Sequence, residues 1–318
     1  MSCSLLEVVE HAGKYFNCWK YEMSGYLNGK GLPVDYLFYN ALESTDKVYA
    51  EIMQKKKNRW IFDTTCLRQD EQLELIGVRL VRESPESFEQ LASLITRAMG
   101  MNSAVMLLMD SFYVPHKEHY AKMHTPHSYI ITSSHFDGSK QDHLYNLVDI
   151  VIDDYGDYPY TGSELKPMYE NSQGAYRAVA YYDFESSGVI QEERILAAHL
   201  EHLDQHRDHY TLHDQVIAGL DCFTAFSDQK ELLYHLDMAY TFLAGSRYLY
   251  ARFLNAIGHV RASEAYAKAG EQAESLSNML RRYGIIEEVY MDELMEECKL
   301  MRELDQEGER TVRQQAVV

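Results

Sequence analysis

The sequence predicts an α+β fold for residues 1–190, followed by a helical domain over residues 191–318 that packs on it. Strand-like apolar runs alternate with helical patterns before residue 190, whereas almost every later segment has helical periodicity. Asp137-Gly138, between two of the apolar runs, is a hairpin signal and indicates an antiparallel sheet. These observations describe a layered domain with an appended helical region.

The elements of the first domain follow from local signals. A helix is expected over residues 18–30, where Gly-rich residues before Pro33 end it. Ser84 and Pro85 are a typical helix start, and that helix should end at Gly100. Strands are expected over residues 73–82, 104–110, 128–134, 144–153 and 175–184.

The second domain should consist of amphipathic helices, with a loose tail at residues 311–318. The helices are expected over residues 192–222, 228–256, 260–282 and 285–306. Histidines recur along the first of them at alternating steps of three and four, at His199, His202, His206, His209 and His213. This spacing puts them on one stripe, which we interpret as a contact between helices rather than a metal site.

The charge balance limits the classes of function. Asp and Glu number 49 and Lys and Arg 30, so the formal net charge is −19. Nucleic-acid binding is disfavoured, because binding to phosphates needs a basic surface. The excess of acidic residues is consistent with cationic partners such as amines, or it keeps the protein soluble. No apolar run is long enough to span a membrane, and the N-terminal residues do not form a signal-peptide core. We therefore expect a cytoplasmic protein.

The cysteines are widely separated and form no CxxC pair. This excludes a disulfide framework and disfavours a cysteine zinc site, so no metal is expected. Each cysteine is then a buried apolar residue, or one of them is a nucleophile. The five are Cys3, Cys18, Cys66, Cys222 and Cys298.

Three residues form a candidate catalytic constellation. Cys18 lies at the expected start of the first helix, where the helix N-terminus and a nearby histidine favour a thiolate. His127 lies at the mouth of one hairpin strand and Asp149 on the other, so the carboxylate could orient the imidazole. The alternatives are a small buried residue for Cys18 and a surface residue at a strand end for His127. His124 is the alternative base.

Four segments carry a resemblance to a known family. They are NCWKYEMSGYLNGKG with Cys18, the strand VMLLMDSFYVPH, the His127 strand PHSYIITSSHFDG and the Asp149 strand LYNLVDIVIDDYG. Over about residues 15–160 the chain resembles the papain-like acyltransferases related to peptidases that trim bacteriocin leaders, typified by the butirosin-pathway acyltransferase. The order of His strand, Gly turn and Asp strand is the most specific part of this resemblance.

The resemblance implies a papain-like fold in which an N-terminal helix bears the Cys and an antiparallel sheet bears the His and Asp. Cys18 would be the nucleophile, His127 the base and Asp149 the orienting group. The acyl donor would be carried on the phosphopantetheine of a partner acyl or aryl carrier protein, with no cofactor bound to the enzyme. The peptidase relatives place a Gln shortly before the Cys, and this chain does not. Asn17 or the Cys18 backbone N–H would then hold the oxyanion, which weakens a peptidase interpretation.

Length, acidity and the helical C-terminal half give a narrower resemblance to the transferases of petrobactin biosynthesis, which join dihydroxybenzoyl to spermidine. A polyamine needs spaced carboxylates and aromatic faces. The candidate substrate-binding residues are Asp153, Asp154, Tyr155, Asp157 and Tyr158. The alternative is a solvated acidic turn with tyrosines packed on the sheet. The implied function is amide formation between an acyl group and a polyamine, in siderophore or related biosynthesis.

Two further features are assigned by chemistry and position. Asp110 follows a strand and is expected to face the cleft and position substrate. A short basic run could dock the carrier protein or be a solvated helix end; it contains Lys55, Lys56, Lys57 and Arg59. The competing functions are a cysteine peptidase of the same fold and a helical interaction protein without catalytic activity. The oligomeric state stays open, with a homodimer among the options.

Overall fold

The computed structural model describes residues 5–151, 154–184 and 189–316. The chain divides into two compact units, each built from three segments. The first unit comprises Met1–Val9, Cys18–Pro33 and Gln69–Ile190, and the second comprises Glu10–Asn17, Val34–Arg68 and Gln191–Val318. The expected division at residue 190 therefore differs from these units at residues 10–17 and 34–68, which belong to the helical unit.

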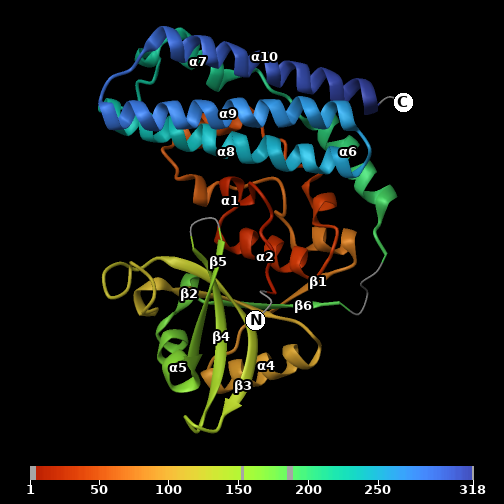
Figure 1. The fold of residues 1–318 in the computed structure, drawn as a ribbon, viewed down its shortest axis with the longest axis vertical. Coiled ribbons are helices and arrows are strands. Elements are labelled where there is room, and N and C mark those ends of the chain that lie inside the picture. Colours follow the sequence, from red (N-terminus) through yellow and green to blue (C-terminus); the bar gives the residue numbers. More distant parts are fainter. Residues whose placement is uncertain (1–4, 152–153, 185–188, 317–318) are drawn as a thin grey trace. The chain divides into compact units, whose positions relative to one another are not determined.

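One antiparallel sheet organises the first unit (Figure 1). Within the described residues it has six strands in the order β1-β6-β2-β3-β4-β5, and every neighbouring pair is antiparallel. The strands are β1 (Arg79–Glu83), β2 (Val105–Asp110), β3 (Pro126–Asp137), β4 (Asp142–Val151), β5 (Asp154–Thr161) and β6 (Ala178–Asp183). The α+β class and the antiparallel sheet are confirmed, and the papain-like assignment stays a prediction.

Helices cover both faces of this sheet. They are α2 (Cys18–Gly29), α4 (Phe88–Gly100) and α5 (Gly162–Asn171). Strand side chains alternate between faces, and Leu107, Tyr129 and Leu147 form one core with α4 and α5. On the other face Tyr26 of α2 packs on Tyr182, with ring centroids 4.9 Å apart. Helix α2 contacts the strands β2, β3 and β4.

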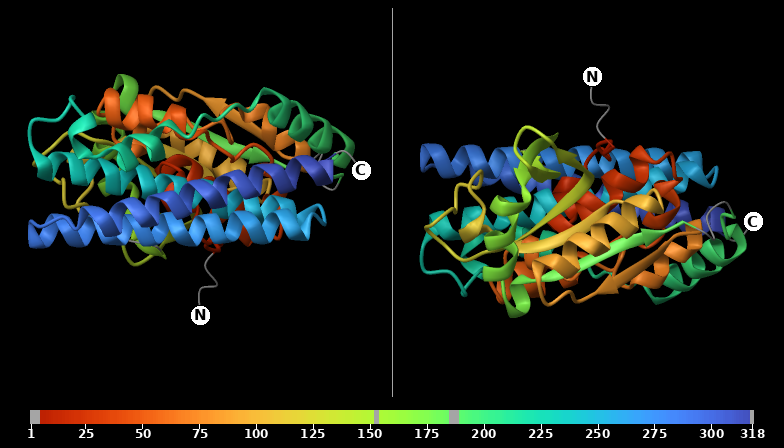
Figure 2. Two further views of the ribbon diagram at one scale, coloured as in Figure 1. Left: turned by 90° about the horizontal axis from the view of Figure 1, so that it is seen from above. Right: turned by 90° about the horizontal axis from the view of Figure 1, so that it is seen from below.

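The second unit is built from helices in its described part. They are α1 (Ala12–Tyr15), α3 (Thr45–Val48), α6 (Glu192–Gln205), α7 (Thr211–Ala218), α8 (Gln229–Ala256), α9 (Val260–Ile286) and α10 (Met291–Ala316). The long helices α8 and α9 pack along each other, as do α9 and α10, the two blue helices of Figure 2. No helix in the described ranges is both long and apolar enough to cross a membrane.

A buried charge network joins α7, α8 and α10. Arg247 donates to both carboxylate oxygens of Asp305 at 2.9 and 2.8 Å, and His213 Nε2 lies 3.2 Å from the same group. Arg247 also donates to the backbone carbonyl of Glu43 at 2.6 Å. This bond explains why residues 34–68 belong with the later helices. Charges this deeply buried depend on their partners for stability.

The structure corrects several predicted elements in the first unit. Only the end of the strand expected over residues 73–82 is formed, because residues 70–76 make a 3₁₀-helix that ends where Gly77 adopts φ 74°. Ser87, rather than Ser84, caps α4 by accepting a hydrogen bond from the Gln90 backbone N–H. The expected hairpin is present between β3 and β4. Neither β5 nor α5 was expected.

The helical unit also differs from its expected pattern. The helix expected over residues 192–222 is broken into α6 and α7, so His206 and His209 lie outside both helices and the predicted histidine stripe is not continuous. The expected break at Gly284 is absent, since α9 runs through it. The tail is helical as far as Ala316, because α10 continues through the residues expected to be loose.

Candidate active site

Cys18 is the first residue of α2, where unpaired backbone N–H groups favour a negative charge. Its thiol lies close to the His127 side chain and to Ser128 of β3, and both favour its ionised form. Burial raises the pKa of the Cys18 thiol, but His127 and Ser128 outweigh burial and lower it to about 7. About half of the thiol is therefore ionised at neutral pH.

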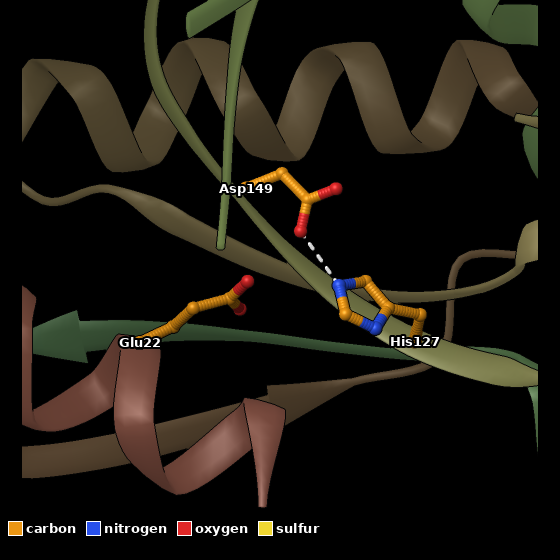
Figure 3. Close-up of side chains that lie close together, drawn as sticks. All are labelled: Glu22, His127 and Asp149. Carbon is orange, nitrogen blue, oxygen red and sulfur yellow. Dashed lines mark hydrogen bonds and ion pairs between the residues drawn. The ribbon is translucent and has the colours of Figure 1, made fainter. Parts of the chain in front are cut away.

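His127, the second residue of β3, joins this thiol to a carboxylate. Its Nε2–H donates to Asp149 Oδ1 on β4 at 2.6 Å (Figure 3). Burial lowers the pKa of His127, but the bonds to Asp149 and Cys18 raise it to about 10. Asp149 holds Nε2, which leaves Nδ1 as the ring nitrogen for the thiol. An imidazolium and a thiolate therefore coexist near neutral pH.

Asp149 is a fully buried carboxylate that accepts four hydrogen bonds. Besides the bond from His127, the donors are the backbone N–H of Ile150 at 2.6 Å, His116 Nε2 at 2.8 Å and Lys117 Nζ at 2.9 Å. Burial raises the pKa of Asp149, but these histidines and the Lys117 charge hold it below its ordinary value. The carboxylate stays ionised and fixes the orientation of the imidazole.

Tyrosines of β5 hold His116 in place. Its ring stacks on Tyr158 with centroids 3.7 Å apart and an interplanar angle of 8°. Its Nδ1 lies 2.8 Å from the hydroxyl of Tyr160. Both ring nitrogens of His116 are thus engaged, one on Tyr160 and one on Asp149. His116 therefore supports the carboxylate rather than offering a base.

Glu22 lies one helical turn after Cys18 and points toward His127 and Asp149 (Figure 3). One side-chain atom from each of Glu22, His127 and Asp149 lies within 4.8 Å of the other two. The Glu22 side chain is fully buried, and neither oxygen makes a hydrogen bond of ordinary geometry within the described residues. Burial, with the nearby charges of Cys18 and Asp149, raises the pKa of Glu22 well above its usual value. Burial therefore favours the neutral form of Glu22 beside His127 and Asp149.

One imidazole and two carboxylates can also be a metal-ligand set. Here, however, Lys117 places an ammonium group 2.9 Å from Asp149, and the Asp149 oxygens already accept four hydrogen bonds. The donor set does not fit a divalent cation, and the expectation that no metal is held stays a prediction.

Asp110 and His124 form a second pair rather than joining the first. His124 Nδ1 lies 2.6 Å from Asp110 Oδ2. Asp110 is buried, whereas His124 is exposed. His127 is therefore the histidine that Asp149 orients, whereas Asp110 contacts His124, and the expected role of Asp110 in positioning substrate stays a prediction.

The acidic and aromatic residues expected to bind a polyamine do not share one surface. Asp154 and Tyr158 lie on one face of β5, and Tyr155 and Asp157 lie on the other, because strand side chains alternate. Tyr155 stacks against Tyr21 of α2 and donates to its backbone carbonyl at 3.3 Å. Asp154 and Asp157 are exposed, while Asp153 falls outside the described residues.

The basic run belongs to the second unit, and its charges are already paired. Lys55 and Lys57 both bind Glu51, and Lys56 binds Glu231 at 3.1 Å. Arg59 donates to two backbone carbonyls, those of residues 13 and 14. The lysines of the run therefore take part in ion pairs, and its role in carrier docking stays a prediction. Asn17 also belongs to the second unit, and its role at the oxyanion stays a prediction.

Sequence reasoning missed Glu22, Lys117 and Ser128. A signal was available for Glu22, because a residue four positions after Cys18 lies on the same helical face. Ser128 directly follows His127, but a strand pattern alone does not indicate that it contacts a thiol. Lys117 lies in an irregular segment, where no periodicity predicts the direction of a side chain.

Comparisons with known proteins bear on the chemistry of this site. No protein-family profile matches the chain. The chain is 24% identical over 302 residues to the ribostamycin:4-(γ-L-glutamylamino)-(S)-2-hydroxybutanoyl-[BtrI acyl-carrier protein] 4-(γ-L-glutamylamino)-(S)-2-hydroxybutanoate transferase of Niallia circulans. The match covers 93% of this chain and 94% of that protein. The chain is similar to a carrier-protein acyltransferase. The four sequence segments around Cys18, His127 and Asp149 predict a resemblance to acyltransferases of this kind.

Proposed function

We propose that this protein is a cysteine-dependent acyltransferase that takes an acyl group from a carrier-protein thioester and passes it to an amine through an acyl-enzyme on Cys18. The observation that carries the proposal is a thiol of pKa about 7 in contact with an imidazole that a buried carboxylate holds at 2.6 Å. Such arrangements form and discharge acyl-enzymes. The similarity to a carrier-protein acyltransferase supports the donor class.

In the first step the Cys18 thiolate attacks the thioester carbonyl of the donor. The carbon–sulfur bond to the carrier breaks, and the His127 imidazolium gives its proton to the departing thiolate. The backbone N–H of Cys18, at the start of α2, stabilises the oxyanion, and we retain Asn17 as the second donor. The acyl-enzyme is left with a neutral His127 that can accept a proton in the next step.

For the acceptor we propose a polyamine such as spermidine, and for the acyl group dihydroxybenzoyl, in siderophore or related biosynthesis. The net charge of −19 favours a cationic acceptor. On β5, Asp157 shares a face with Tyr155, which packs on α2, so Asp157 is the described acidic residue that we assign to the acceptor. Asp154 lies on the opposite face and is the matched control.

The proposal is tested by mass-spectrometric detection of the amide formed from a dihydroxybenzoyl-loaded carrier protein and spermidine. The unchanged protein and Cys222→Ala should form the amide, because Cys222 is an exposed thiol outside the site. Cys18→Ala should form none. Amide formation by Cys18→Ala would refute the acyl-enzyme. Release of the free acid, with no amide from spermidine or other amines, would favour a hydrolase or peptidase of the same site.

Two substitutions test the acceptor assignment in the same assay. Asp157→Asn should raise the KM for spermidine and leave acylation of Cys18 unchanged, because the carboxylate is exposed and contacts only Asn146 among its described hydrogen bonds. Asp154→Asn should change neither. Equal KM values for all three proteins would remove Asp157 from the acceptor site.

A further inference from the structure

A second histidine–aspartate pair lies in the segment that joins β2 to β3. His124 Nδ1 donates to Asp110 Oδ2 at 2.6 Å. Asp110 Oδ1 accepts from the backbone N–H groups of Phe112 and Thr125, each at 3.1 Å. The Asp110 side chain is only 5% exposed, so these donors converge on a buried carboxylate. The pair is a built feature of the fold, not a chance surface contact.

The pair sets which nitrogen of His124 can take up a proton. Because Nδ1–H points at Asp110, the lone pair of the neutral ring is on Nε2. The side chain is 54% exposed, so a molecule in solution can reach it. Two other histidines of this segment are less suited. His116 has both nitrogens engaged, and His119 lies 3.7 Å from its sequence neighbour Glu118.

Strand alternation places Asp110 on the face of the sheet that Cys18 contacts. Leu108 pairs with Ser128, and Asp110 pairs with Pro126. Side chains two residues apart point the same way, so Asp110 and Ser128 share a face as diagonal neighbours, roughly 7–8 Å apart. Ser128 lies close enough to the Cys18 thiol to lower its pKa. Asp110 and Cys18 are therefore both neighbours of Ser128.

The proposed reaction releases one more proton than the first pair can take. An alkylammonium must lose a proton before its nitrogen can attack, and it loses another as the amide bond forms. The bond between the acyl carbon and Cys18 breaks in this step, which restores the thiolate. His127 takes one proton and returns to the imidazolium of the resting enzyme. The other proton needs a second base.

We propose that His124, oriented by Asp110, is the base that removes the first proton from the ammonium group of the acceptor. This inference rests on the proposed acyl transfer to an amine. Nε2 of His124 takes the proton and later releases it to water. The charge balances, since one ammonium becomes a neutral amide while Cys18 becomes a thiolate and His124 and His127 become imidazolium ions. His124 is a catalytic residue in this account, and Asp110 is a positioning residue.

The groups around the His124 ring suit this exchange. The ring stacks on Phe112 with centroids 4.3 Å apart, and it meets the Tyr113 ring edge to face with centroids 6.1 Å apart. The Asp110 carboxylate and the Phe112 ring hold the imidazole in one orientation. The exposed side of the ring provides the route by which the proton leaves.

The test compares two acceptors in the discharge of a preformed acyl-enzyme. The protein is acylated with a small dihydroxybenzoyl thioester, and loss of the acyl mass is followed after adding spermidine or methoxyamine. Methoxyamine is already neutral at neutral pH and needs no second base. His124→Gln should slow discharge by spermidine by about a hundredfold and leave discharge by methoxyamine within about twofold of the unchanged protein. Raising the pH toward the pKa of the amine should shrink the difference.

Two further variants keep the test decisive. His119→Gln, in the same segment, should discharge to both acceptors at the unchanged rates. Asp110→Asn keeps an oxygen for Phe112 and Thr125 and should repeat the spermidine-selective loss of His124→Gln. Equal slowing with both acceptors, or no slowing, would overturn the inference while leaving the Cys18 acyl-enzyme intact. Failure of the unchanged protein to form any Cys18 adduct would overturn the proposed function and this inference with it.

Discussion

Replacing His127 by alanine is expected to raise the pKa of the Cys18 thiol by about two units. The thiol has a pKa of about 7, and without His127 burial opposes the remaining effect of Ser128, so the pKa should return to about its ordinary value of 9. Two units correspond to about 2.7 kcal/mol of lost thiolate stabilisation. At neutral pH the ionised fraction should fall from about half to about 1%.

The assay is alkylation by iodoacetamide across a pH series, with the site of labelling read by peptide mass. Cys18 should label with a midpoint near pH 7 in the unchanged protein and near pH 9 in His127→Ala. Cys222 is exposed and provides an internal reference whose rate should not change. His119→Ala is the matched control and should keep the midpoint near pH 7. An unchanged midpoint in His127→Ala would refute the idea that His127 stabilises the thiolate.

Three further predictions follow from the same contacts. The rate of Cys18 acylation should rise with a midpoint near pH 7 as the thiolate forms, and fall near pH 10 as His127 loses the proton it donates; stopped-flow acylation measures this. Because the pKa of Glu22 is raised in the folded protein, the unfolded chain releases this proton first and stability should fall as the pH rises above the ordinary Glu pKa. Glu22→Gln should therefore stabilise the fold, with a gain in unfolding free energy that grows with pH over that range in urea melts. Arg247→Met should cost about 3–5 kcal/mol of unfolding free energy by the same method, because it strands the buried charge of Asp305.

Each of these has a clear contrary result. Acylation that is flat between about pH 6 and about pH 8 would show that thiol ionisation does not limit the step. A stability gain in Glu22→Gln that does not vary with pH would mean that Glu22 is ionised in the folded protein. A loss below about 1 kcal/mol in Arg247→Met would place that ion pair among those that contribute little.

Much of the sheet and of the central site could be predicted from local sequence. The helix start at Cys18 and the hairpin around residues 137–142 follow from position and turn chemistry, and they bring His127 and Asp149 together. A missed signal lay at Thr161, where a Thr-x-x-Glu capping box with Glu164 starts α5. From the sequence, residues 154–158 are instead interpreted as a polyamine site, with a solvated acidic turn as the alternative.

Other features depend on tertiary contacts that periodicity does not encode. Lys117 lies beside Asp149 only because an irregular segment folds back toward β4. The histidines after His199 have regular spacing, but the helix ends before His206. The later histidines therefore do not lie on the same helix face as His199 and His202. Residues 34–68 join the second unit through bonds such as that between Arg247 and the Glu43 carbonyl. No local signal in either segment predicts that pairing.

The most direct test of the central claim is to locate the acyl group after the protein meets a dihydroxybenzoyl-loaded carrier protein. Rapid quenching, proteolysis and peptide mass spectrometry identify the modified residue. We predict one acyl adduct on Cys18, which disappears when spermidine is added and which is absent in Cys18→Ala but present in Cys222→Ala. Amide formed with no adduct on Cys18, or an adduct on another residue that spermidine discharges, would contradict the account.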